Sequence, residues 1–149
     1  MTTTHWPPQH ILVGIDGSDQ ATRAAKTAAD MARTNGARLT IMTVVRPPEG
    51  WWGIVGTPPT ATAMARMLES AQRDVLDAIE KNVDLTDVTY ELVEEIGDPA
   101  AVLSNYTLNN DVDLVILGRQ GAGLLERIMI GSVANRVSHK APSPVMLVP

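Results

Sequence analysis

Residues 10–18 of the chain read HILVGIDGS, and this stretch indicates the fold. The run from His10 to Ile15 is apolar and does not alternate with polar residues, which is typical of a strand covered on both faces, as in a parallel sheet. Ser18 or Asp19 can cap the segment that follows, where alanines recur at helical spacing. A buried strand, a glycine-containing turn and a helix therefore form the predicted first unit.

The next part of the chain predicts a second such unit and the start of a third. Residues 38–45 read as another strand, and Val88, Tyr90 and Leu92 alternate with polar residues, which predicts a half-exposed third strand at a sheet edge. A helix is expected between these strands. Its predicted inward face consists of Met64, Met67, Leu68, Ala71, Val75, Ala78 and Ile79.

The C-terminal half continues the alternation. Asp98-Pro99 is a strong helix start, residues 114–117 are a fully apolar strand, Ser132 opens a last helix, and residues 144–148 form a final strand. Strands that alternate with helices indicate an open, doubly wound, five-stranded parallel sheet with helices on both faces. The expected fold class is therefore α/β and Rossmann-like.

Composition limits the classes of protein that remain. The chain has 149 residues and no cysteine, which excludes disulfides, thiol catalysis and thiolate metal sites. Residues 1–9 have neither a basic start nor an apolar run, so we expect a disordered lead-in, with a single domain at residues 10–149. No apolar run reaches the roughly 20 residues that span a bilayer. We expect a cytoplasmic protein with no membrane partner.

Charge is distributed unevenly along the chain. The net charge is −5, made up of −8 over residues 1–117 and +3 over residues 118–149. An acidic body disfavours nucleic acid, because non-specific binding depends on a basic face that neutralises phosphates. A short basic segment suits a small anion, although the same residues can simply solvate a helix.

A glycine-spaced loop follows the predicted fourth strand. It contains Gly118, Gly121 and Gly131, and the last of these precedes Ser132 at the start of the final helix. Backbone N–H groups that curve around a phosphate need glycine, and a helix N-terminus favours an anion. If the first and fourth strands are neighbours, Asp16 faces the same crevice. Ser132 can donate its hydroxyl to a phosphate or merely cap its helix.

Two common nucleotide motifs are absent. The loop has no Gly-Lys-Ser/Thr, so it is not the usual NTPase phosphate loop, and Glu126 stands where the dinucleotide pattern requires its last glycine. No catalytic base stands out, because His10 and His139 are interpreted as structural. Arg119 and Arg127 leave open a slow ATPase or phosphotransferase.

The chain resembles the universal stress protein family from Ile11 to Val148. Its ATP-binding members carry glycine, two residues, glycine, nine residues, glycine and Ser/Thr, and the loop from Gly118 to Ser132 satisfies every term. Residues 11–18, 97–99 and 141–145 also resemble family signatures. The resemblance implies a sheet ordered 3-2-1-4-5, ATP bound across strands one and four, and a homodimer formed through Val145–Val148.

The resemblance also implies the binding residues. It places Asp16, with the backbone of Gly14 and Ile15, at the nucleoside, and the backbone of Val44 at adenine. The ribose and phosphate positions are matched by Gly118, Gly121, Gly131, Ser132 and Val133, with Arg119 beside them. No metal site of the protein's own is expected, although Asp16 can ligate a Mg²⁺ that ATP carries.

The function expected from these features is that of an ATP-binding stress-response regulator, a nucleotide-dependent dimeric switch with at most weak hydrolysis. A slow ATPase or phosphotransferase and a nucleotide-free dimeric interaction module are the alternatives. ATP is not distinguished from other adenine nucleotides, and the protein partners stay unknown. The loop around Trp51-Trp52 is interpreted as a lid, a dimer contact or simply an exposed loop.

Overall fold

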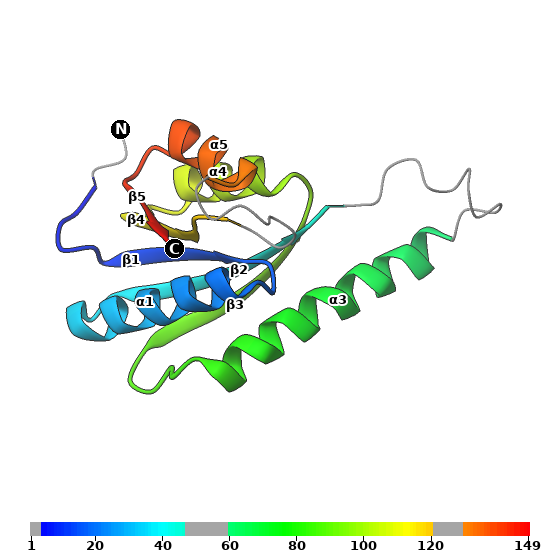
Figure 1. Cartoon of the computed structure of the whole chain (residues 1–149), viewed down its shortest axis with the longest axis horizontal. Coiled ribbons are helices and arrows are strands. Elements are labelled where there is room, and N and C mark those ends of the chain that lie inside the picture. The colour runs from blue at the N-terminus through cyan, green and yellow to red at the C-terminus, as the bar shows by residue number, and fades with distance from the viewer. Residues whose placement is uncertain (1–3, 47–59, 121–129) are drawn as a thin grey trace.

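The computed structural model describes residues 4–46, 60–120 and 130–149 and contains a five-stranded parallel sheet (Figure 1). The strand order is β3-β2-β1-β4-β5, which confirms the predicted order and fold class. The strands are β1 His10–Ile15, β2 Arg38–Val45, β3 Thr89–Ile96, β4 Leu114–Gly118 and β5 Val145–Val148. The helices in the described ranges are α1 Asp19–Asn35, α3 Ala61–Asn82, α4 Pro99–Asn109 and α5 Ser132–Lys140.

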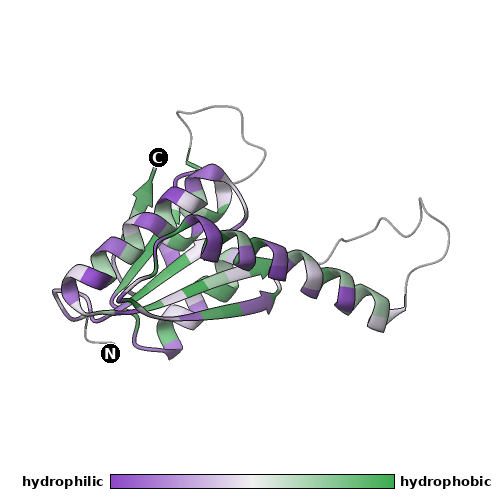
Figure 2. Ribbon diagram, turned by 90° about the horizontal axis from the view of Figure 1, so that it is seen from below, coloured by the Kyte–Doolittle hydropathy of each residue, from purple (hydrophilic) through white to green (hydrophobic). Residues whose placement is uncertain are grey.

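Two hydrophobic layers lie on the two faces of the sheet. Alternate residues of β1 enter different layers: Ile11 and Val13 pack with the alanines of α1 and with α3, whereas Leu12 packs with α4 and α5. Figure 2 shows the apolar strands between helices whose outer surfaces are hydrophilic. Because both faces are covered, β1 has no polar alternation, as its sequence predicted.

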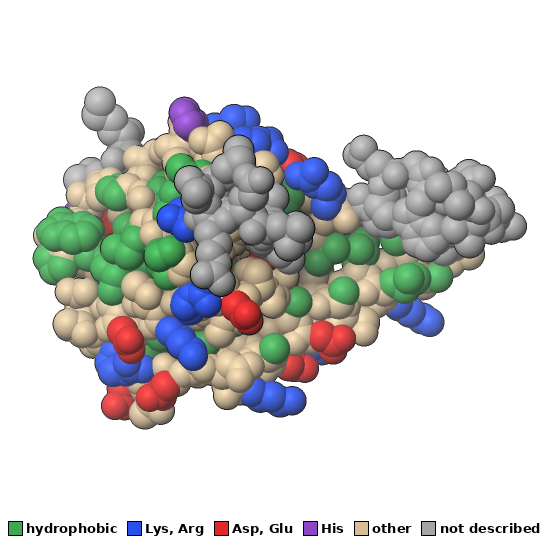
Figure 3. Space-filling model, viewed as in Figure 1, with side chains coloured by type: hydrophobic (Ala, Val, Ile, Leu, Met, Phe, Trp, Pro, Cys, Tyr) green, Lys and Arg blue, Asp and Glu red, His purple; other side chains and the backbone are tan. Residues whose placement is uncertain are grey.

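Helix α3 departs from its predicted packing. Its buried residues are Gln72, Leu76 and Ile79, whereas Met67 of the predicted inward face is 58% exposed. The first half of α3 extends beyond the sheet (Figure 1), and the buried residues of the helix begin only at Gln72. Hydrophobic and charged side chains are both exposed along this helix (Figure 3).

The polar exception in α3 has a structural reason. The side chain of Gln72 is buried, and its amide donates hydrogen bonds to the carbonyl oxygens of Thr43 on β2 and Glu95 on β3. It thereby satisfies main-chain acceptors at the edge of the sheet, where β3 is half exposed as predicted. β3 runs to Ile96, four residues beyond Leu92, where the alternating segment that predicted this strand ends.

Asp113 attaches the segment that precedes β1. Its carboxylate accepts hydrogen bonds from the backbone N–H groups of His5, Gln9 and His10, at 2.9 to 3.0 Å. Part of the expected lead-in is therefore held against the domain, while residues 1–3 lie outside the described residues. The domain boundary at residue 10 stays a prediction. Within the described ranges, no helix combines the length and apolar character needed to cross a membrane.

A polar chain crosses the sheet near the start of β1. Thr40 donates its hydroxyl hydrogen to Glu91 Oε1 at 2.8 Å, so it accepts from Nε2 of His10 at 2.9 Å. Nδ1 of His10 is then the acceptor for the Arg38 guanidinium at 2.9 Å, and Tyr106 also donates to Glu91. Nδ1 also lies 3.0 Å from the Asn110 carbonyl oxygen, which can only accept, so neutral His10 with its hydrogen on Nε2 satisfies the Thr40 and Arg38 contacts but not this one. These contacts give His10 a structural role.

Stability should fall on mild acidification because of His10. Burial, and next the adjacent Arg38, lower the pKa of His10 below 6.5. The unfolded chain then binds more protons, so the contribution of His10 is complete above pH 6.5 and is lost as the pH falls through the folded-state pKa. Urea unfolding at pH 7.5 and pH 5.5 should show this loss in the wild type and a smaller one in His10→Gln. The exposed His139→Gln is the control, and an unchanged loss in His10→Gln would contradict the assignment.

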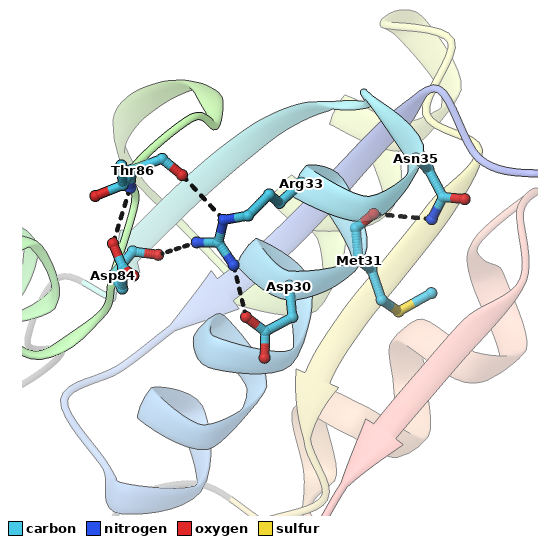
Figure 4. Close-up of polar contacts among 6 residues, drawn as sticks. All are labelled: Asp30, Met31, Arg33, Asn35, Asp84 and Thr86. Carbon is cyan, nitrogen blue, oxygen red and sulfur yellow. Dashed lines mark hydrogen bonds and ion pairs between the residues drawn. The ribbon is translucent and has the colours of Figure 1, made fainter.

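Arg33 joins α1 to the connection between α3 and β3 (Figure 4). Its guanidinium donates to the carbonyl oxygens of Asp84 at 2.7 Å and Thr86 at 3.0 Å, and to the carboxylate of Asp30 at 2.8 Å. The three acceptors are bound by three different nitrogens of the planar guanidinium, and the one nitrogen of a lysine ammonium cannot occupy all three positions.

Arg33→Lys should therefore lower the unfolding free energy by about 1 kcal/mol, which is less than the roughly 1.5–3 kcal/mol of buried charged hydrogen bonds because the side chain is partly exposed. The expected fall in Tm is about 2–4 °C, measured by thermal denaturation followed by circular dichroism. Arg66→Lys, at an exposed position of α3, is the matched control and should melt with the wild type. Equal melting of both variants would rule out this role.

Candidate functional site

A pocket of about 430 Å³ lies beyond the carboxyl ends of the central strands. β1 pairs with β4 on one side and β2 on the other, so the predicted neighbourhood of Asp16 and the glycine loop is confirmed for the described part of the loop. α4 contributes Leu103, and the start of α5 closes the other side. This is the position at which open α/β sheets bind ligands.

The pocket collects most of the predicted binding residues in one place. Those that line it are Gly14, Ile15, Asp16, Val44, Gly118, Gly131, Ser132 and Val133. Arg119 is not among the lining residues. Gly121, Arg127 and the Trp51-Trp52 loop lie outside the described residues. Lining residues that sequence reasoning did not name are Ala21, Met42, Leu103, Leu117, Gln120, Ile130 and Ala134.

One end of the pocket is apolar. Met42 and Val44 of β2 point to the same face of the sheet, and Leu103 and Leu117 join them from α4 and β4. Met42 could have been found from the sequence, because it lies two residues before Val44 on the same strand face. The contribution of Leu103 depends on how α4 packs and has no local signal.

The other end contains the N-terminus of α5. The other described helices, α1, α3 and α4, are capped by the side chains of Ser18, Thr60 and Asp98. The N-cap of α5 is Gly131, which makes no side-chain hydrogen bond. The expectation that Ser132 caps this helix is wrong, because Ser132 is already its first helical residue. The first-turn N–H groups at residues 132–134 have no intrahelical acceptor, and these residues line the pocket.

Asp16 lies exposed at the pocket mouth. One of its carboxylate oxygens, Oδ1, accepts from the backbone N–H of Ser18 at 3.0 Å and from its hydroxyl at 2.6 Å. These bonds form a turn that orients the carboxylate while Ser18 caps α1. Among the described lining residues, Asp16 is the only ionisable side chain.

Gly118 and Gly14 each permit a close approach. A Cβ on Gly118 would lie 3.1 Å from the backbone of Gln20 and Ala21, which is tighter than an ordinary contact, so a side chain at residue 118 would push the start of α1 away from β4. A Cβ on Gly14 would lie 2.8 Å from the Leu117 side chain and 3.2 Å from that of Leu103. Gly118, the first glycine of the loop, therefore contributes to packing and also lines the pocket.

Asp98 joins the elements around the pocket. Arg136 of α5 donates two hydrogen bonds to its carboxylate, at 2.8 and 2.9 Å, and Arg46 contacts it from the end of β2. These bonds from Arg136, followed by that from the Ala101 N–H, lower the pKa of Asp98 to about 2. The carboxylate stays charged at neutral pH and holds α4 and α5 together.

The model of the universal stress protein family matches residues 8–149. The chain belongs to this family. A universal stress protein of Thermus aquaticus is 33% identical over 141 residues, which cover 93% of this chain and 96% of that protein. The solved universal stress protein UspA from Lactobacillus plantarum superimposes with a TM-score of 0.77 at 23% identity, covering 95% of this chain and 97% of that one.

Some structural neighbours within the family hold adenine nucleotides. One universal stress protein was solved in complex with cAMP (TM-score 0.65, 23% identity, 95% and 96% of the chains covered). Another, from Archaeoglobus fulgidus, was solved in complex with dAMP (TM-score 0.63, 22% identity, 95% and 98% covered). At these identities the likeness shows a shared fold.

Proposed function

We propose that the chain binds ATP in this pocket and acts as a nucleotide-dependent dimeric switch in a stress response. The observation that carries the proposal is the α5 N-terminus, which receives no side-chain cap from its N-cap residue Gly131 within the described part of the chain and lies at a pocket whose other end is apolar. Uncapped N–H groups and the positive end of the helix dipole suit phosphate, and an apolar slot suits a base. The adenine nucleotides in the two family neighbours add support.

The apolar end of the pocket would bind the base of the nucleotide, and the end at the start of α5 would bind its phosphates. Adenine would lie against Met42, Val44 and Leu103, with the backbone of Val44 as a hydrogen-bonding partner. Asp16, beside Gly14 and Ile15, would hold the ribose hydroxyls, since a carboxylate accepts from two neighbouring hydroxyls. Gly131, Ser132 and Val133 would receive the phosphates, with Gly118 and Gly121 bounding that end and Arg119 nearby. Mg²⁺ would arrive with ATP, and the Asp16 carboxylate is the acidic group that could ligate it.

Binding without efficient hydrolysis is the proposed mode of action. Asp16 is the only ionisable group among the described lining residues, and its Oδ1 is already engaged by Ser18. A general base must also lie within reach of an attacking water. The pocket therefore favours a sensor over a catalyst.

Dimer formation through β5 is part of the proposal. β5 is an edge strand whose residues are half-buried, and an unpaired apolar edge is a surface that pairs readily with a second strand. The backbone of Arg119 links this edge to the pocket, because its N–H donates to Val148 O at 2.8 Å and its carbonyl accepts from the Gly131 N–H at 2.7 Å. Occupation of the pocket and pairing of β5 would thus affect each other.

A cytoplasmic location is proposed from the absence of cysteine in the chain, which suits a reducing compartment.

The test is titration calorimetry on protein purified free of nucleotide, with ATP, dAMP, cAMP and adenosine as ligands. Measurable heat with ATP in the presence of Mg²⁺, and a sedimentation coefficient that changes on ATP addition, are the expected results. If none of the four ligands gives a measurable heat of binding at millimolar concentration, the proposal is wrong and a nucleotide-free interaction module is favoured. Phosphate release that is abolished in Ser132→Ala would favour the slow ATPase instead.

A further inference from the structure

Gln20 lies in the first turn of α1, outside the pocket lining, and both ends of its side-chain amide contact one residue. Its Oε1 accepts from the backbone N–H of Gln120 at 2.7 Å, and its Nε2 donates to the side-chain Oε1 of Gln120 at 3.3 Å. Gln120 lines the pocket and is only 2% exposed. The amide of Gln20 therefore fixes both the main chain and the side chain of a buried wall residue.

The main chain beside Gln120 is held at further points. The backbone N–H of Arg119 donates to Val148 O, its carbonyl accepts from the Gly131 N–H, and the absence of a Cβ on Gly118 lets the start of α1 lie close to the end of β4. Gln20 is the contribution of α1 to this arrangement. The glycine at residue 118 keeps the start of α1 close to this part of the chain.

The contact between Gln20 and Gln120 also indicates which backbone N–H groups at this end of the pocket could bind a phosphate. Because the Gln120 N–H donates to Gln20, that peptide group is already used within the protein. A phosphate would instead meet the N–H groups at the start of α5, on the other side of the hydrogen bond between Arg119 and Gly131. Gln20 thus keeps the wall at Gln120 in one position relative to those donors.

We propose that Gln20 is a positioning residue for the phosphate end of the pocket, acting through Gln120. This rests on the proposed nucleotide function and adds a residue to it. Pre-positioned donors bind more tightly than donors that must be ordered by the ligand. The effect should be confined to phosphate-bearing ligands, because the apolar end at Met42, Val44 and Leu103 lies on the β2 side of the sheet.

The test replaces Gln20 by methionine, which has a similar length and no hydrogen-bonding amide. Gln20→Met should weaken ATP binding about fivefold to tenfold by calorimetry, as expected for the loss of one to two hydrogen bonds, and change adenosine binding less than twofold. In the nucleotide-free protein, exchange of the Gln120 amide hydrogen, followed by NMR, should become at least about tenfold faster. Gln20→Ala should behave in the same way.

Gln9→Met is the matched control, because Gln9 is an exposed glutamine before β1, and it should leave all three values at those of the wild type. Thermal denaturation establishes that each variant is folded. The inference is overturned if folded Gln20→Met binds ATP like the wild type, if adenosine is weakened as much as ATP, or if Gln120 exchange is unchanged. Failure of the wild-type chain to bind any nucleotide would instead overturn the proposed function and this role together.

Discussion

Ser132→Glu should lower the affinity for ATP about 100-fold while leaving the fold intact or slightly more stable. The new carboxylate would stand in the first turn of α5, where the proposed phosphate site lies. Two like charges about 4 Å apart repel by up to about 4 kcal/mol near a protein surface, and a 100-fold loss corresponds to about 2.8 kcal/mol. The same carboxylate complements the helix dipole, which adds about 0.3–1 kcal/mol to stability.

Calorimetry with ATP and adenosine, combined with thermal denaturation of the nucleotide-free protein, measures both effects. Adenosine has no phosphate, so its affinity should stay close to that of the wild type. Ser138→Glu adds the same charge at an exposed position in the last turn of α5 and should leave ATP binding unchanged. ATP affinity in Ser132→Glu equal to that of Ser138→Glu would place the phosphates elsewhere.

Gly118→Val should destabilise the nucleotide-free protein by about 3 kcal/mol, the upper end of the cost of overpacking. Even the Cβ of the new side chain would lie 3.1 Å from the backbone of Gln20 and Ala21, and a helix backbone cannot rotate away as a side chain can. For a domain of this size, the expected fall in Tm is roughly 6–12 °C.

Gly14→Ala is the comparison variant for Gly118. Its Cβ meets the ends of two leucine side chains, Leu103 and Leu117, which can shift at lower cost. We expect a smaller loss of Tm and a weaker affinity for adenosine, because the displaced leucines line the pocket. A Gly118→Val protein that melts with the wild type would contradict the packing role of Gly118.

The order of elements and most of the pocket were predictable from local patterns. The non-alternating run of β1 indicated burial on both faces, and the spacing from Gly118 to Ser132 indicated an anion site before a helix. Such patterns work because strand periodicity, glycine and helix starts depend on neighbouring residues. They failed for α3, whose amphipathic face is longer than the sheet that it covers, so Met67 stays exposed.

Contacts between distant residues were decided by the tertiary structure. The pairing of Gln20 with Gln120, the packing of α1 against Gly118 and the placement of Leu103 in the pocket join segments that no local spacing relates. Each depends on β1 and β4 being neighbours, because this brings α1 beside the end of β4. The sequence by itself determined an α/β chain with a glycine-spaced loop. Only the folded sheet decided that the start of α5 has no side-chain cap at the pocket, because capping depends on the conformation of Gly131 and not on the presence of Ser132.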